Sequence, residues 1–134
     1  MKINKILIVD DDRDFLRALT LRLKANNYQV VQAVDAGSAI VMTSRESPDL
    51  IVLDLGLPGG DGFLIMQRLK SAPSTAALPV IVLTAKDAEG NQERAYEAGA
   101  ADFLQKPVNN EWLLGAIEGA LDVVQHVALQ QIAR

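Results

Sequence analysis

The sequence has no cysteine and only one histidine among its 134 residues. Without cysteine, the chain can form neither a disulfide framework nor a thiolate metal site or nucleophile. One histidine is too few for a histidine-rich zinc site. A metal ion bound to this chain would therefore have to be held by oxygen atoms.

Long apolar runs and a strong positive charge are also missing. Apolar stretches such as Val80–Leu83 fall far below the roughly 18 residues that a membrane span needs. Residues Met1–Lys5 offer no apolar signal-peptide segment. We therefore expect a soluble, cytoplasmic protein with no membrane contact. The formal net charge of -4 disfavours direct binding to nucleic acid, which relies on clustered Lys and Arg.

With 134 residues, 49% of them apolar, the chain has the length and composition of one compact domain. Three short apolar runs, rich in β-branched residues, indicate strands that are buried on both faces of a parallel sheet. These runs are Ile6–Val9, Leu50–Leu53 and Val80–Leu83. Weaker strands are expected at 28–33 and 101–105.

The segments between the strands carry apolar residues at helical spacing. The residues that define this spacing are Phe15, Leu16, Leu19 and Leu23, then Ala36, Ala39 and Ile40, then Phe63, Met66 and Leu69, and last Leu114, Ile117, Leu121 and Val124. Gly99 is placed as the C-cap of the fourth helical segment. The alternation predicts a doubly wound α/β fold, (βα)5, with a parallel five-stranded sheet. The flavodoxin-like order 2-1-3-4-5 is one of the two common strand orders of such a sheet, and it is the order we expect here.

Polar side chains stand where four of the predicted strands end: Asp10 and Asp11, Asp54, Thr84, and Lys106. Ligands of an open α/β sheet bind at this edge, so we expect these side chains to share one pocket. Carboxylates about 4 Å apart repel by roughly 4 kcal/mol at an effective dielectric near 20, which a divalent cation relieves. Mg²⁺ suits oxygen ligands, and Mn²⁺ could substitute. One carboxylate could then attack a phosphoryl group whose oxygens accept hydrogen bonds from Thr84 and Lys106.

With these features the chain resembles the receiver domain of two-component response regulators from about Lys5 to Leu121. The motifs that carry the resemblance are Asp10-Asp11-Asp12, Asp54-Leu55-Gly56-Leu57-Pro58, Asp61-Gly62, Thr84-Ala85 and Lys106-Pro107. Each motif is weak alone, but the ordered set is specific. The resemblance implies a receiver domain at residues 1–121. Such a domain takes a phosphoryl group from a sensor histidine kinase or a histidine phosphotransfer protein and signals to a downstream output domain or protein.

The resemblance also implies a role for each site residue. Asp54 is the phosphoacceptor, and Asp11 and Asp54 bind Mg²⁺ through their carboxylates. Asp10 binds the ion through water, and Gly56 binds it through its backbone carbonyl. Lys106 contacts the phosphoryl group, and the bond that joins it to the following proline is often cis in this family.

Thr84 and Phe103 form the switch pair that the resemblance implies. Phosphate draws Thr84 toward it, and Phe103 enters the vacated space. Phe103 stands where many family members have Tyr. Gly56 and Lys86 differ from frequent residues at positions where attacking water would enter, which leaves the lifetime of the phosphate open.

Two other classes of function compete with a signalling domain. A haloacid-dehalogenase-like phosphohydrolase also uses a strand-end Asp nucleophile with Mg²⁺, Thr and Lys. Such enzymes carry a second Asp two residues after the nucleophile, where this chain has Gly56. A degenerate receiver that serves only for docking is disfavoured by the complete acidic, Thr and Lys set. We therefore expect no enzyme activity beyond the domain's own phosphorylation and dephosphorylation.

Three further features have structural explanations. Asp12 is expected to cap the first helix, His126 to lie on the surface or pack, and Trp112 to pack near the start of the last helix. Residues 122–134 are expected to extend that helix or to begin a linker. Apolar residues at steps of three and four predict a coiled-coil seam, which could form a homodimer or lead to an output domain. This seam consists of Leu114, Ile117, Leu121, Val124 and Ala128.

Overall fold

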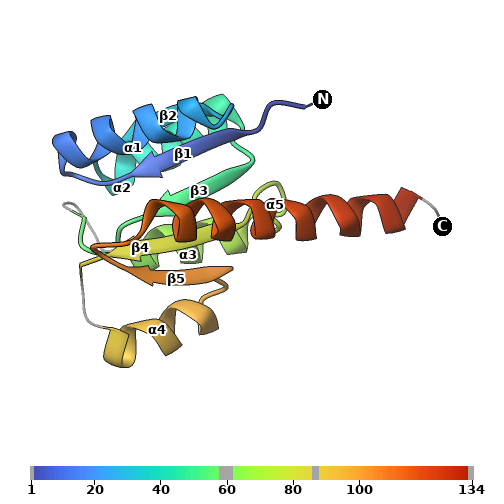
Figure 1. Cartoon of the computed structure of the whole chain (residues 1–134). Coiled ribbons are helices and arrows are strands. Elements are labelled where there is room, and N and C mark those ends of the chain that lie inside the picture. Colours follow the sequence, from blue (N-terminus) through green and yellow to red (C-terminus); the bar gives the residue numbers. More distant parts are fainter. Residues whose placement is uncertain (1, 58–61, 86–87, 133–134) are drawn as a thin grey trace.

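A computed structural model describes residues 2–57, 62–85 and 88–132. Within these residues five strands alternate with five helices, as the apolar pattern predicts (Figure 1). In chain order the elements are β1 Lys5–Val9, α1 Arg13–Ala25, β2 Gln29–Ala33, α2 Ala36–Glu46, β3 Leu50–Leu53, α3 Gly62–Ser71, β4 Val80–Thr84, α4 Ala88–Glu97, β5 Asp102–Gln105 and α5 Asn110–Ile132. The predicted (βα)5 order is confirmed.

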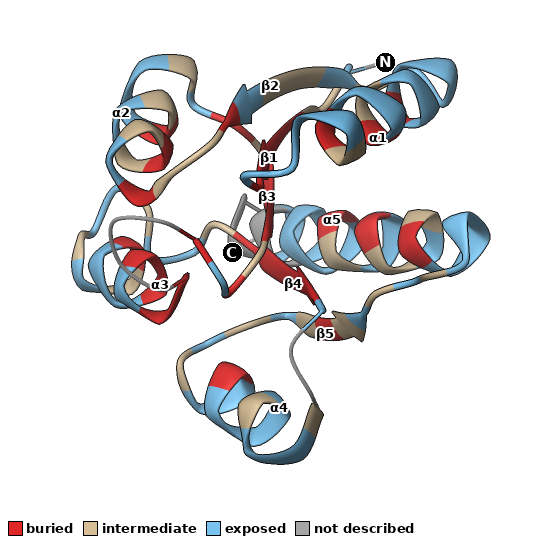
Figure 2. Cartoon of the chain, turned by 90° about the vertical axis from the view of Figure 1, so that its left-hand side faces the viewer, coloured by how far each residue is buried: buried red, intermediate tan, exposed pale blue. Residues whose placement is uncertain are grey.

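The strands form one parallel sheet in the order β2-β1-β3-β4-β5, which confirms the flavodoxin-like topology. Helices α1 and α5 cover one face, and α2, α3 and α4 lie on the other side (Figure 2). Successive side chains of a strand point to opposite faces, so each apolar run contributes to two cores. In β1, for example, Ile6 and Ile8 pack toward α1 and α5, whereas Leu7 and Val9 pack toward α2 and α3.

Helix α1 begins directly after the acidic residues that follow β1. The Asp12 carboxylate accepts hydrogen bonds from the backbone N–H groups of Asp14 and Phe15, each at 3.1 Å. This N-cap satisfies backbone donors that have no partner within the helix. The prediction that Asp12 caps the helix is confirmed, and the cap holds the first turn of α1 beside the loop that carries Asp10 and Asp11.

Helix α4 is held more loosely than its neighbours. Ala95 is the residue of α4 that is buried, and the backbone leaves helical geometry at Glu89 and at Gly90, where φ is 75°. The helix ends at Glu97, and Gly99, two residues later, is left-handed, with φ of 101° and a backbone N–H that donates to the Tyr96 carbonyl. The predicted glycine C-cap is therefore confirmed.

Helix α5 is 23 residues long and projects beyond the sheet toward its C-terminal end (Figure 1). Ile117 and Leu121 lie buried in the core of their own domain. Trp112 was expected to pack at the start of this helix, but its side chain is 72% exposed and that expectation is wrong. In the described part of the chain, no helix combines the length and apolar character needed to cross a membrane.

Candidate functional site

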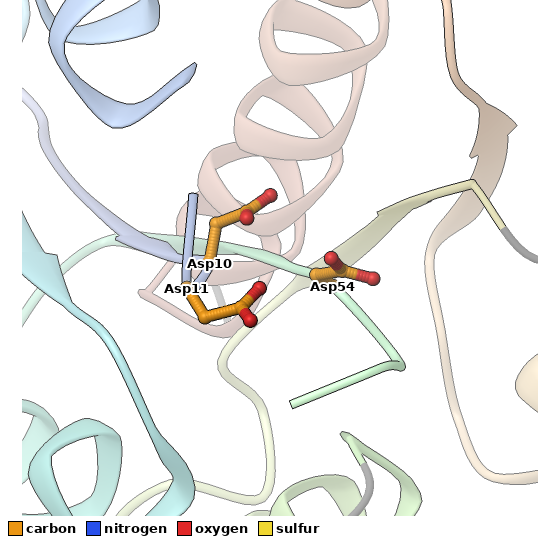
Figure 3. Close-up of side chains that lie close together, drawn as sticks. All are labelled: Asp10, Asp11 and Asp54. Carbon is orange, nitrogen blue, oxygen red and sulfur yellow. The ribbon is translucent and has the colours of Figure 1, made fainter. Parts of the chain in front are cut away.

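Three carboxylates meet where β1 and β3 end. These strands are neighbours, and the backbone pairing continues past them: the Asp10 N–H donates to Ala33, and the Asp54 N–H donates to Val9. Asp10, Asp11 and Asp54 each offer a carboxylate oxygen, and these oxygens lie within 4.8 Å of one another (Figure 3). The predicted acidic cluster is thus assembled by the parallel sheet.

Asp10 is the buried member of the cluster, with 2% of the residue exposed. One of its oxygens accepts the backbone N–H of Asp12 at 2.9 Å, and the other lies 2.5 Å from the Lys106 ammonium. Burial raises the pKa of Asp10 above its usual value, while Lys106 and the Asp12 N–H act in the opposite direction. Both oxygens of this carboxylate are therefore already bonded within the protein.

Asp54 is half-buried at the end of β3 and has partners on both oxygens. Its Oδ1 accepts the Thr84 hydroxyl at 2.7 Å and the Gly56 backbone N–H at 3.1 Å. Its Oδ2 lies 3.6 Å from Lys106 Nζ. The structure thus places Gly56 beside Asp54 through its N–H, whereas the role of its carbonyl as a metal ligand stays a prediction.

Lys106 reaches the cluster from the end of β5, on the far side of β4. Its backbone N–H donates to the Thr84 carbonyl at 2.8 Å, and the Lys106–Pro107 peptide bond is cis, as the resemblance implied. The ammonium lies between Asp10 and Asp54 and also sits 4.0 Å from the centre of the Phe15 ring. The position of Phe15 in the sequence predicts only a place on the apolar face of α1, because nothing in the sequence indicates a contact with Lys106.

The two residues of the predicted switch pair lie on adjacent strands. Thr84 ends β4 fully buried, and Phe103 of β5 packs 7% exposed into the core on the α2, α3 and α4 side. The Thr84 hydroxyl donates to Asp54, and Phe103 lies in the core. That these two residues act as a switch stays a prediction. Two other predicted positions, Asp61 and Lys86, lie outside the described residues.

The donor set fits a hard divalent cation. Within the described residues the cluster consists of carboxylate oxygens alone, with Lys106 as the cation that contacts it. Oxygen ligands of this kind suit Mg²⁺, which keeps several of its waters. Asp11 is exposed and has no hydrogen bond within the described residues, so its carboxylate is free to bind an ion directly. Asp10, with both oxygens bonded, suits a contact through water.

Comparisons with known proteins agree with this geometry. Residues 6–118 match the family "Response regulator receiver domain". The chain is similar to the response regulator PleD of Caulobacter vibrioides, with 40% identity over 113 residues that make up 84% of this chain and 25% of PleD. It is also similar to protein PilH of Pseudomonas aeruginosa, with 37% identity over 117 residues that make up 87% of this chain and 97% of PilH.

A solved structure shows the same likeness in three dimensions. The CheY-like response regulator receiver domain protein from Methanospirillum hungatei has a TM-score of 0.87 and 28% identity, covering 93% of this chain and 98% of that one. The chain thus spans about a quarter of PleD but nearly all of PilH. The matched region includes every strand described above except the first residue of β1, and it includes the whole acidic cluster. The chain therefore belongs to the response regulator receiver domain family of two-component systems.

Proposed function

We propose that Asp54 accepts a phosphoryl group from the phosphohistidine of a sensor histidine kinase or a histidine phosphotransfer protein. The observation that carries this proposal is the convergence of three carboxylates within 4.8 Å, with Thr84 and Lys106 both contacting Asp54. An Asp54 oxygen attacks the phosphorus, the phosphorus–nitrogen bond breaks, and the imidazole leaves with the electron pair. The product is an acyl phosphate on Asp54.

Asp11 and Asp54 would hold Mg²⁺ or Mn²⁺ directly, Asp10 would hold it through water, and the Gly56 carbonyl would complete the protein ligands. A bound ion supplies the positive charge that lets a phosphoryl group approach a cluster of carboxylates. Asp10 keeps its hydrogen bond from the Asp12 N–H, which fixes the loop in place during the reaction.

Thr84 and Lys106 stabilise the phosphoryl oxygens. The Thr84 hydroxyl donates to Asp54 Oδ1 now and needs only a small shift to donate to a phosphoryl oxygen. The Lys106 ammonium moves from Asp10 toward Asp54, where a charge-assisted hydrogen bond balances the added negative charge. Phosphate then favours the population in which Thr84 and Phe103 hold their inward positions, and this alters the surface of α4, β5 and α5.

The partners follow from this chemistry. A phosphohistidine donor of the two-component type places the reaction in the cytoplasm. The signal passes to a downstream protein or to an output segment within a longer chain. PleD, of which this chain matches 25%, is a longer chain of this kind. Any binding to DNA would belong to such an output segment and not to this acidic domain.

Uptake of beryllofluoride, a mimic of the phosphoryl group, tests the proposal. We expect saturable binding in the presence of Mg²⁺ or Mn²⁺, no binding in EDTA, and no binding by Asp54→Asn. Asp12→Asn is the matched control, because it removes a neighbouring carboxylate while asparagine still caps α1. Equal phosphorylation of Asp54→Asn and the wild type by phosphoramidate would exclude Asp54 as the acceptor.

The phosphohydrolase alternative predicts a different result. Gly56 supplies no carboxylate to activate water beside Asp54, so we expect negligible turnover of generic phosphate monoesters. Multiple-turnover release of phosphate from such an ester by the wild type would favour the enzyme over the signalling domain.

A further inference from the structure

The ammonium of Lys106 is enclosed by three groups from three parts of the chain. Asp10 lies 2.5 Å from it, Asp54 lies 3.6 Å from it, and the centre of the Phe15 ring lies 4.0 Å from it. The Lys106 side chain is 19% exposed, so these contacts replace most of the water that would otherwise surround the charge. Two of the three groups are anions, and the third is a neutral ring.

The neutral ring attracts the Lys106 ammonium without adding negative charge to the site, which a further carboxylate could not do. The negative face of an aromatic ring attracts an ammonium at this distance but carries no net charge. An additional carboxylate would hold Lys106 in an ion pair and would repel an incoming phosphoryl group. The ring of Phe15 therefore restrains Lys106 while leaving it able to exchange Asp10 for a phosphoryl oxygen on Asp54.

The ring is itself fixed by the fold. Phe15 stands in the first turn of α1, and its backbone N–H donates to the capping carboxylate of Asp12. The ring and Lys106 both line a cavity of about 650 Å³ between α1 and α5, together with Leu19, Pro107 and other residues. The cavity is open to solvent, so removing the ring would enlarge it beside the ammonium and let more water reach the charge.

We propose that Phe15 is a positioning residue that holds the Lys106 ammonium where it can bind a phosphoryl group on Asp54. This inference rests on the proposed function and adds a residue to it. In this role Phe15 acts on the phosphoryl group through Lys106, while the ring also packs against the core on the α1 and α5 side. Its contribution should depend on the aromatic ring and not only on apolar volume.

The test compares Phe15→Leu, which keeps an apolar side chain of similar size, with Phe15→Tyr, which keeps the ring. Beryllofluoride affinity is measured in the presence of Mg²⁺, and urea unfolding confirms that each variant is folded. We expect Phe15→Leu to bind about 3- to 30-fold more weakly, in line with the usual strength of a cation–π contact. Phe15→Tyr should stay within about twofold of the wild type.

A second measurement needs neither metal nor beryllofluoride. The ring current of Phe15 should shift the ε-proton resonances of Lys106 upfield in NMR spectra of the lysine-labelled protein. This shift should be lost in Phe15→Leu and kept in Phe15→Tyr. Assignment of the resonance comes from its disappearance in Lys106→Arg.

Three results would overturn the role of Phe15. These are wild-type affinity in folded Phe15→Leu, equal weakening in the leucine and tyrosine variants, and an ordinary Lys106 resonance in the wild type. Failure of the wild type to bind beryllofluoride would instead remove the proposed function, and the positioning role with it. The two failures are therefore distinguishable, because only the second affects the unsubstituted protein's affinity.

Discussion

At the scale of single residues, the site is a cluster of negative charge held together by the backbone. Carboxylates about 4 Å apart repel by roughly 4 kcal/mol at an effective dielectric near 20. Lys106 contacts Asp10 and Asp54 but leaves Asp11 without a partner in the described residues. The structure therefore tolerates an electrostatic cost that a bound cation would offset, as is common where a site is built for function.

Burial of Asp10 makes the stability of the folded domain depend on pH. Its pKa is raised above 3.8 in the folded state, chiefly by burial. As pH rises past 3.8 the unfolded state therefore loses this proton first, and the folded state binds more protons in the window above that value. The contribution of Asp10 to the free energy of unfolding is therefore largest below this window and falls as pH rises through it.

We therefore expect Asp10→Asn to gain stability relative to the wild type as pH increases from below 3.8 toward neutrality. Urea unfolding in EDTA at several pH values measures the difference between the two proteins. The same substitution should weaken the binding of Mg²⁺. A stability difference that does not change with pH, or that moves in favour of the wild type, would contradict the raised pKa.

We also predict that the residue at position 56 affects the lifetime of the acyl phosphate on Asp54. Gly56→Asp would place a candidate general base beside Asp54, where such groups typically accelerate reactions by roughly 10² to 10⁴-fold. We expect faster decay of the acyl phosphate but a smaller gain, because the new charge also repels the phosphoryl group. Decay is followed after removal of the donor. Gly56→Asn, which has the same size but no base, should decay more slowly than Gly56→Asp, and equal rates would contradict the argument.

At the scale of secondary structure, the site depends on how closely α3 approaches the end of β3. The Gly62 N–H donates to the Leu55 carbonyl at 3.0 Å. A Cβ atom at Gly62 would lie 2.8 Å from the backbone oxygen of Asp54 and 2.9 Å from the Cα of Leu55. Real Cβ atoms do not approach backbone so closely, so only glycine fits at the start of α3.

Gly62→Ala should therefore destabilise the domain by about 1–3 kcal/mol, as overpacking usually does. It should also weaken beryllofluoride binding, because the backbone that must give way carries Asp54. Gly119→Ala in α5 is the matched control: its Cβ would meet nothing within 4 Å. That variant should gain about 0.5–1 kcal/mol from helix propensity. Urea unfolding checks both, and similar behaviour of the two alanine variants would contradict the close approach.

At the scale of the whole molecule, α5 belongs to the core for part of its length and projects beyond it for the rest (Figure 1). The predicted coiled-coil seam is divided between these parts. Ile117 and Leu121 are buried against the sheet, so they are not available to a second chain. The projecting segment has no Asp, Glu, Lys or Arg between Val123 and Ile132, and Val123 and Leu129 are 64% and 65% exposed.

An uncharged helical segment with exposed apolar side chains favours association. We therefore expect the full chain to form dimers through the projecting part of α5 and a chain that ends at Leu121 to be monomeric. Sedimentation velocity with and without beryllofluoride measures this. The shortened chain should retain its fold, because Leu121 is the last residue in the buried core among the α5 side chains that the structure describes. An association state that does not depend on residues 122–134 would exclude this dimer.

Much of the fold could be predicted from the sequence, because the pattern of apolar residues within a short segment indicates whether that segment forms a strand or a helix. Runs such as Ile6–Val9 and Leu50–Leu53 are apolar at every position, which occurs when both faces of a strand are covered. Parallel strands end at one edge, so residues directly after them must gather there. Asp10 and Asp54 meet at this edge as predicted. Asp12 caps α1, as an acidic side chain at the start of a helix predicts.

The tertiary structure alone decided which long side chains meet. Whether Lys106 pairs with Asp10, and whether the Phe15 ring covers it, depends on distances between elements that packing sets and that no spacing encodes. Trp112 stands at a plausible packing position, yet the core beside α5 is filled by other side chains and leaves it exposed. The sequence by itself determined the alternation of strands and helices and the acidic edge, because these follow from periodicity and chain order, and its ordered motifs carried the family resemblance. The tertiary structure decided how the charges in that edge are paired and buried, because pairing and burial depend on the positions of all the elements at once.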